Sequence, residues 1–272
     1  MNSSVSIVRA ILKRGEHLKM NEKLVSIAMA TYNGEQYLRE QLDSIYNQTY
    51  KNIEIIVCDD CSSDKTVEIL EEYKQKYGLK HFINEKNLGF IKNFEKAASL
   101  CNGEYIAFSD QDDIWMSEKI QVLLDELGEN TMIHSDAIPV DAEKNIIAES
   151  AKVHYKVKKF VYPPEAHNRY INWITCVQGC TALCKREILH YALPIPNFTE
   201  SHDFWFGFIA SKMNGIKYLD KPLIYWRIHG KNTTNPSRLS HKIYMLFGTH
   251  ILRTYRFIKR LYFLKQRGLE WK

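Results

Sequence analysis

Short apolar runs alternate along the chain with longer stretches in which apolar residues recur every three or four positions. The runs cover residues 24–30, 53–58, 81–84 and 105–108 and are rich in β-branched and aromatic residues. Such runs indicate buried strands, whereas the three-or-four spacing between them indicates amphipathic helices. Because the two patterns alternate, the sequence predicts an α/β fold with a doubly wound, mostly parallel sheet.

Polar side chains follow three of these predicted strands. The C-terminal ends of parallel strands meet at one edge of the sheet, where ligands bind in open α/β folds. Clustered carboxylates at that edge suit Mg²⁺ or Mn²⁺, although a solvated acidic turn is the alternative for any one of them. The three polar segments are Thr31-Tyr32-Asn33, Asp59-Asp60 and Asp110-Gln111-Asp112-Asp113. No GxGxxG or GxxxxGK[ST] motif accompanies them, which excludes a dinucleotide fold and a P-loop.

The composition is that of an ordinary globular protein, with 45% hydrophobic and 25% charged residues in a chain of 272. No run approaches the roughly 18 apolar residues of a membrane span, and the N-terminus lacks the pattern of a signal peptide. We therefore expect a cytoplasmic protein whose six cysteines are free thiols. Cys58 and Cys61 have no second pair to complete a zinc site. Cys176, Cys180 and Cys184 are interpreted as small apolar residues.

Several separated motifs occur in one order: VSIAMATYNGE, IIVCDDCSSDKT, NLGFIKN and FSDQDDIW. In this order, residues 24–127 resemble the nucleotide-binding half of family 2 glycosyltransferases, which have the GT-A fold. The resemblance implies that Thr31 and Tyr32, with Asn33 beside them, line the pocket for the base. It also implies that Asp60 hydrogen-bonds the edge of a uracil or thymine.

The same resemblance assigns the acidic segment. It implies that Asp110 faces the ribose and the metal and that Asp112 is the principal metal ligand. Gln111 between them is neutral, so no obvious ligand is lost. Mg²⁺ or Mn²⁺, rather than a glycine loop, would then neutralise the diphosphate of a nucleotide sugar.

The second half of the chain contributes the acceptor side. Residues 177–181 resemble the glycine-containing acceptor segment of the family, and a tight turn leading into a helix at 184–191 is an equal alternative. The residues implied in acceptor contacts are Gly179, Cys180, Thr181 and the later His202.

One acid stands at the start of a strongly apolar helix. Asp203 precedes four aromatic residues within five positions, and an acid there could simply favour the helix dipole by ~0.3–1 kcal/mol. The resemblance instead implies a catalytic base, because relatives place theirs in a matching acid–aromatic segment. Apolar neighbours would also raise the pKa of Asp203 towards neutrality.

An Arg-x-His segment ends the predicted catalytic body. It resembles the segment that closes over the diphosphate in many relatives, although a lone histidine is often structural. The resemblance implies that His229 contacts the metal and that Arg227 or Lys231 contacts phosphate.

These features predict an inverting glycosyltransferase that uses a UDP- or dTDP-sugar, with rhamnose favoured. The expected acceptor is a hydroxyl of a growing, lipid-linked bacterial surface glycan. A nucleotidyltransferase is one alternative, although the glycine-rich phosphate loop expected of it is missing. A non-catalytic nucleotide-binding assembly partner is the other. We divide the chain into a lead-in (1–22), a nucleotide-sugar-binding half (23–135) and an acceptor and base half (136–237) of one GT-A domain, and a tail (238–272).

The tail carries the positive charge of the protein. Residues 238–272 have a net charge of +8, whereas the rest of the chain has −3. At 3.6 residues per turn, the tail forms a basic amphipathic helix, typical of contact with an anionic membrane surface. The alternative is a helix that docks on the catalytic body or on another subunit; the oligomeric state stays open, and we expect no nucleic-acid partner. The apolar face comprises Ile243, Phe247, Ile251, Ile258, Leu261 and Tyr262, and the opposite face comprises Lys242, Arg253, Arg256, Arg260 and Arg267.

Overall fold

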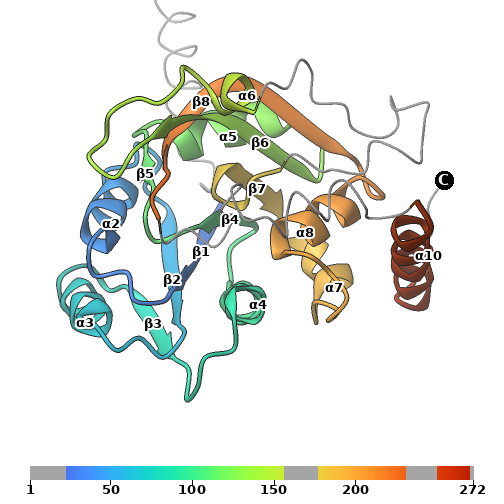
Figure 1. Ribbon diagram of the computed structural model, residues 1–272, viewed down its shortest axis with the longest axis horizontal. Coiled ribbons are helices and arrows are strands. Elements are labelled where there is room, and N and C mark those ends of the chain that lie inside the picture. The colour runs from blue at the N-terminus through green and yellow to red at the C-terminus, as the bar shows by residue number, and fades with distance from the viewer. Residues whose placement is uncertain (1–22, 156–176, 231–249, 270–272) are drawn as a thin grey trace, which may run out of the picture.

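One sheet of eight strands forms the centre of the protein (Figure 1). The computed structural model describes residues 23–155, 177–230 and 250–269. The strands follow the order β3-β2-β1-β4-β7-β6-β8-β5 across the sheet. In chain order they are β1 (Val25–Thr31), β2 (Ile53–Asp59), β3 (Lys80–Ile83), β4 (Tyr105–Ser109), β5 (Ile114–Trp115), β6 (Met132–Val140), β7 (Ala182–Lys185) and β8 (Ile216–Arg227).

Helices cover both faces of the sheet. They are α2 (Leu38–Tyr46), α3 (Thr66–Tyr77), α4 (Phe90–Ser99), α5 (Lys119–Leu127), α6 (Ala151–His154), α7 (Leu189–Ala192), α8 (His202–Ala210) and α10 (His250–Gln266), with 3-10 turns η1 (Gly179–Thr181) and η2 (Arg186–Ile188). Alternate residues of one strand serve the two cores. In β1, Ile27 and Met29 pack with α2, α3 and α5, whereas Ala28 packs with α4 and α8. Burial on both faces explains why the strands are continuous apolar runs.

The first half of the sheet is purely parallel. Strands β3, β2, β1 and β4 pair in parallel, so β1, β2 and β4 end at one edge. Strand β7 runs antiparallel to both β4 and β6, and β8 runs parallel to β6 and antiparallel to β5. The predicted doubly wound, mostly parallel sheet is confirmed, and the polar segments after β1, β2 and β4 share one edge. Strand β6 spans the boundary predicted between residues 135 and 136, so both halves belong to one sheet.

The helix predicted for residues 184–191 is wrong at its start. Residues 182–185 form β7, and helical structure begins only at Arg186. Leu183 is buried in one core while Ala182 and Cys184 are buried in the other, the alternation of a strand between two packed faces. A short apolar run does not distinguish a buried strand from a helix by its pattern alone, and pairing with β4 and β6 decides here.

The C-terminal helix α10 packs beside α8 (Figure 1). Its Phe263 ring lies 5.7 Å from the Trp205 ring, and Leu264 is fully buried. Arg260 pairs with Glu200 and stacks on Phe204 at 4.4 Å. The docked arrangement that we left open is therefore observed for the described end of the tail.

The outward face of this helix differs from the prediction. Arg260 and Arg267 were predicted on a basic face opposite the apolar one, but Arg260 is buried and Arg267 donates to the carbonyls of Tyr191 and Pro194 at 2.6 and 3.0 Å. Ile258 and Tyr262, predicted on the apolar face, are 58% and 63% exposed, so the apolar face does not dock as a whole. Guanidinium groups that stack on aromatic rings and donate to carbonyls can be buried, which a hydropathy pattern does not register. The lead-in and the tail before residue 250 lie outside the described residues.

Among the helices that the structure describes, none combines the length and apolar character needed to cross a bilayer.

Candidate active site

Polar side chains tie the ends of β1 and β2 together. Thr31 donates from Oγ1 to Asp59 Oδ2 at 2.8 Å, and Asp59 also accepts from the backbone and hydroxyl of Ser62. Asn93 of α4 donates to the carbonyls of Thr31 and Cys58 at 3.3 and 2.7 Å. Thr31, which we predicted to contact the nucleotide, thus lies at the expected edge of the sheet, and its hydroxyl donates a hydrogen bond to Asp59.

The loop after β1 is held by a residue to which we assigned no role. Gln111 accepts from the Tyr32 N–H at 2.8 Å and donates to the Tyr32 carbonyl at 3.0 Å. Gly34 permits this approach, because a Cβ there would meet Gln111 Oε1 at 2.3 Å. Asn33 adopts a left-handed φ of 47°, and its Oδ1 accepts from the Ser63 N–H at 2.8 Å. The Tyr32 ring is left 49% exposed, so it can stack on a flat ligand.

Asp60 organises the segment that leads into α4. Its carboxylate accepts from the Asn84 side-chain amide at 2.9 Å and from the backbone N–H groups of Leu88 and Gly89 at 2.7 and 2.9 Å. It is 2% exposed. Gly89 has a φ of 82°, which glycine adopts without strain. The role of Asp60 towards a pyrimidine edge stays a prediction.

Residues 110–113 are here called the acidic loop. Its three aspartates contact different partners. Asp112 Oδ2 lies 2.9 Å from His229 Nε2, so two predicted metal ligands are in contact. The His229 ring lies 5.0 Å from the Tyr37 ring of the segment before α2. This contact brings the Arg-x-His segment onto the acidic loop.

Asp113 lies deeper than Asp110 and Asp112, which are both partly exposed. Asp113 is 1% exposed, and its Oδ1 accepts from the backbone N–H of Arg227 at 3.1 Å. Burial, followed by the charges of Asp113, Asp112 and Asp203, raises the pKa of Asp110 well above its usual value. Burial and the charge of Asp112 also raise the pKa of Asp113. The raised pKa values mean that the ionised forms of Asp110 and Asp113 are disfavoured here, and a bound cation would stabilise them.

Arg227 fastens the acidic loop to the rest of the site. It is 2% exposed, and its Nε and Nη1 donate to the carbonyls of Asp112 and Ala142 at 2.8 and 2.9 Å. Its Nη2 pairs with Glu40 of α2 at 2.6 Å, and the guanidinium lies 4.5 Å from the centre of the Tyr37 ring. Each guanidinium nitrogen thus has a protein acceptor, so the geometry favours a positioning role over the phosphate contact we expected.

Asp203 begins α8 and accepts three hydrogen bonds. Its Oδ2 accepts from the Gly179 N–H at 3.2 Å, and its Oδ1 accepts from the Phe204 N–H at 2.7 Å and from the Ser201 hydroxyl. Ser201 is also the N-cap of α8. The backbone of the η1 turn therefore fixes one oxygen of the predicted base.

His202 fills the space beneath the η1 turn. Its ring stacks on Phe94 with centroids 3.8 Å apart, and burial lowers its pKa, so the ring is neutral at pH 7. A Cβ on Gly179 would lie 2.6 Å from His202 Nε2, so only glycine fits there. Neither ring nitrogen has a hydrogen-bond partner within the part of the chain that the structure describes.

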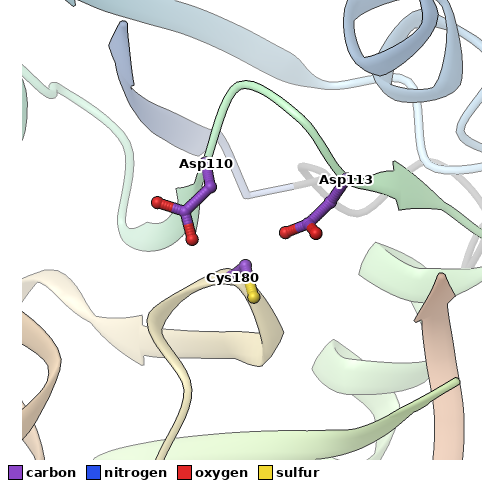
Figure 2. Close-up of side chains that lie close together, drawn as sticks. All are labelled: Asp110, Asp113 and Cys180. Atoms are coloured by element: carbon purple, nitrogen blue, oxygen red, sulfur yellow. The ribbon is translucent and has the colours of Figure 1, made fainter. Parts of the chain in front are cut away.

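The next residue of the same turn faces the acidic loop. Figure 2 shows the Cys180 side chain between the carboxylates of Asp110 and Asp113. Lys119 donates to the Cys180 carbonyl at 2.6 Å and lies 3.3 Å from the centre of the Trp115 ring. Burial lowers the pKa of Lys119 to about 7. The η1 turn thus contacts Asp203 with one residue and the acidic loop with the next.

The residues present fit a divalent cation. Asp110, Asp112 and Asp113 offer hard oxygen ligands on one loop, and His229 adds a nitrogen. The Oδ2 atom of Asp113 is buried without a hydrogen-bond partner in the described structure. A cation would satisfy this oxygen and reduce the repulsion among the acids.

Most predicted site residues converge, but the residues that support them went unnoticed. Thr181 donates to the Gln178 carbonyl at 2.7 Å within the turn, and Lys231 lies outside the described residues. Gln111 and Asp113 were recognised as part of the acidic segment, but the contacts that each one makes could not be predicted from the sequence. Nothing in the sequence marks Glu40 or Lys119.

We expect Arg227→Met to destabilise the fold by about 3 kcal/mol, because the partly buried carbonyls of Asp112 and Ala142 lose the donors of a buried guanidinium. Urea denaturation measures this loss. Glu40→Gln is the matched control: Glu40 is 39% exposed, so its pair with Arg227 is worth less than about 1 kcal/mol. Equal losses in the two variants would contradict the assignment of the carbonyl contacts as the main contribution.

Relatives identify the family. Residues 26–191 match the family model described as Glycosyl transferase family 2. The chain is 31% identical over 221 residues to the dTDP-rhamnosyl transferase RfbG of Shigella flexneri, with 75% of this chain and 72% of that protein covered. It is 29% identical over 204 residues to the UDP-Glc:alpha-D-GlcNAc-diphosphoundecaprenol beta-1,3-glucosyltransferase WfgD of Escherichia coli, with 74% and 75% covered.

The fold agrees with a solved structure. TarS 1–349 of S. aureus in complex with UDP superposes with a TM-score of 0.59 at 24% identity, over 75% of this chain and 60% of that one. This similarity concerns the fold alone, and it confirms the predicted GT-A architecture. With a family model matching residues 26–191 and a relative 31% identical over most of both chains, the protein belongs to glycosyl transferase family 2 and is a glycosyltransferase.

Proposed function

We propose that this glycosyltransferase is inverting and moves a sugar from a UDP- or dTDP-sugar to a hydroxyl group of a glycan acceptor. The observation that carries the proposal is the η1 turn. Its Gly179 N–H donates to Asp203, and its Cys180 lies against Asp110 and Asp113. A candidate base and a candidate metal site therefore face a common space, as a single displacement requires.

The donor side is formed by the ends of β1, β2 and β4. The exposed Tyr32 ring is suited to stack on the base, with Thr31, Asn33 and Asp60 around it and Asp110 towards the ribose. Asp112, with Asp110 and His229, would hold Mg²⁺ or Mn²⁺. The ion would supply positive charge to the departing diphosphate.

Asp203 is the proposed general base. It accepts the proton of the acceptor hydroxyl while the hydroxyl oxygen bonds to the anomeric carbon on the face opposite the diphosphate, and the bond to the diphosphate breaks. One carboxylate suffices, because the diphosphate is a good leaving group and needs no acid. Glycosidases, by contrast, flank the bond with two carboxylates. Hydrogen bonds from Gly179 and Phe204 orient the Asp203 carboxylate.

The names of two relatives support a proposal for the sugar and the acceptor. The identity with a dTDP-rhamnosyl transferase supports rhamnose as the donor sugar. The identity with an enzyme acting on a diphosphoundecaprenol-linked sugar supports a lipid-linked glycan of bacterial surface polysaccharide assembly. Gly179, Cys180, Thr181 and His202 form the proposed acceptor side, and Lys231 keeps its proposed phosphate contact.

A lipid-linked acceptor would place the enzyme at the cytoplasmic face of the inner membrane. The outer side of α10 presents Ile258 and Tyr262, 58% and 63% exposed, with the exposed Lys259 and Lys265. Apolar side chains flanked by lysines suit an anionic lipid surface. We propose that α10 contacts the membrane with this side while Arg260 and Arg267 hold it on the catalytic body.

A donor panel tests the reaction itself. Purified protein with Mn²⁺ is incubated with UDP- and dTDP-sugars, and nucleoside diphosphate release is measured together with the thermal shift. Release of UDP or dTDP from one donor, with stabilisation by the same donor, supports the proposal. Stabilisation without any release, also in the presence of lipid-linked glycan acceptors, would favour a nucleotide-binding protein without transfer activity.

We expect Asp112→Ala to abolish transfer and the metal-dependent part of nucleotide affinity, because the principal carboxylate ligand is lost. EDTA should inactivate the wild type, and Mn²⁺ should restore it. Isothermal titration with UDP, with and without Mn²⁺, measures the binding part. Glu118→Ala, on an acid outside the site whose side chain is 43% exposed, is the control. Full activity in EDTA would remove the metal from this mechanism.

We expect Asp203→Asn to lower turnover by roughly 10²–10⁴-fold with little change in donor affinity, because the amide keeps the size of the carboxylate but cannot accept the proton. Initial rates and donor titrations on the same preparation separate the two effects. Turnover within a few-fold of wild type would transfer the role to another carboxylate, with Glu200 tested first.

We expect the protein to co-sediment with vesicles that contain anionic lipid and to be released at high salt, since each basic residue near such a surface contributes about 1 kcal/mol. Removal of residues 238–272 should abolish binding. Ile258→Ser with Tyr262→Ser should weaken it without disturbing the buried side of α10. Ile146→Ser, at a side chain 65% exposed elsewhere, is the matched control. Equal binding to neutral and anionic vesicles would favour a purely docked helix.

A further inference from the structure

Three potential metal ligands lie close together, and the proposed donor site uses only one of them, Asp110. The oxygens of Asp110 and Asp113 and the sulfur of Cys180 all lie within 4.8 Å of one another. Figure 2 shows the two carboxylates on either side of the acidic loop and the thiol on the η1 turn, all directed to one space. The expected metal ligands Asp112 and His229 lie against each other instead.

A buried oxygen without a partner points to a ligand. Asp113 is 1% exposed, and its Oδ2 accepts no hydrogen bond from any described residue. Leaving such an atom unsatisfied costs about 1–3 kcal/mol, and more for a charged group. Its carboxylate points towards Cys180 and Asp110 (Figure 2). A cation in this space would bind the oxygen that the protein leaves unsatisfied.

Charge and access agree with a divalent ion. With the thiol deprotonated, two carboxylates and one thiolate would face a divalent ion, beside the Lys119 side chain, which interacts with all three groups. Burial and the charges of Asp113 and Asp110 raise the pKa of the Cys180 thiol well above its ordinary value, so the thiol gives up its proton only as the ion binds. Asp110 is partly exposed whereas Asp113 and Cys180 are buried, so an ion enters past Asp110.

We propose that Asp110, Asp113 and Cys180 form a binding site for a divalent transition-metal ion that accepts thiolate, such as Zn²⁺ or Co²⁺. Thiolate selects these ions over Mg²⁺, which prefers oxygen ligands alone. Two ligand atoms of a tetrahedral Zn²⁺ lie about 3.5 Å apart. The three ligand atoms here lie within 4.8 Å of one another, so side-chain movements of about 1 Å would bring them to that separation. The thiol loses its proton to solvent as the sulfur–metal bond forms, and no electron is transferred.

Water would occupy the fourth position, as in open zinc sites with three protein ligands. The spacing of Cys176, Cys180 and Cys184 alone suggested small apolar residues, and the fold separates two of them: Cys184 turns into the core formed with α4 and α8. Cys180 is the thiol that the η1 turn brings to the acids. The assignment does not depend on sugar transfer, so its failure and that of the proposed function are distinguishable.

The test is a titration of the full chain with Co²⁺ alone, followed by absorption spectroscopy. The wild type should develop a sulfur-to-cobalt charge-transfer band, and Zn²⁺ should remove it by competition. Cys180→Ser should abolish the band and weaken Zn²⁺ binding, measured by calorimetry, by about tenfold or more. Asp113→Asn should weaken Zn²⁺ binding in the same way while keeping the thiol.

Three variants serve as controls. Cys184→Ser changes a buried thiol of the other core, Cys61→Ser changes an exposed thiol, and His229→Ala removes the neighbouring imidazole. All three should keep the band, and circular dichroism verifies that each variant is folded. Absence of Co²⁺ binding, binding without a charge-transfer band, or a band that survives Cys180→Ser would each overturn the proposal. Loss of the band in Cys61→Ser would also overturn it, because the metal would then bind at that thiol.

Discussion

The active site depends on one buried guanidinium group. Arg227, at the end of β8, donates to the carbonyls of Asp112 and Ala142 and pairs with Glu40 of α2. It also lies over the Tyr37 ring. The planar guanidinium places donors on three nitrogens, so it reaches acceptors that lie far apart, whereas the three donors of a lysine share one nitrogen. The acidic loop therefore has a fixed backbone although its side chains repel one another.

The acidic loop concentrates negative charge on side chains that are largely shielded from water. Burial and neighbouring acids raise the pKa values of Asp110 and Asp113, so these groups favour the protonated state until positive charge arrives. Lys119 supplies part of that charge from beneath, and it fixes the η1 turn through the Cys180 carbonyl. Lys119 thus positions the η1 turn, and Gly179 of that turn donates to Asp203. Electrostatics and geometry are coupled in one short segment.

The sequence predicted what depends on local pattern. Continuous apolar strands such as β2 and the acids after β4 follow from periodicity and from the common edge of parallel strands. The prediction from sequence failed where pairing between distant segments decides the structure. In β7, a short apolar run predicted to begin a helix pairs with β4 and β6 instead. The prediction also missed Glu40 and Lys119, because a charged residue becomes a site residue only through partners distant in the chain. In α10 the hydropathy pattern assigned Arg260 to the basic face opposite the apolar one, but the side chain is buried and stacks on Phe204.

The contact between Arg227 and Asp112 joins residues 115 positions apart. During synthesis, the strands β1 to β4 emerge from the ribosome long before β8, so the acidic loop is complete in sequence but lacks its donors. Domains fold as units as the chain is made, and here the unit cannot close until nearly the whole catalytic body has emerged. A nascent or truncated chain would therefore hold a cluster of acids without a defined shape. Competence to bind a nucleotide sugar would thus be among the last properties that the growing polypeptide acquires.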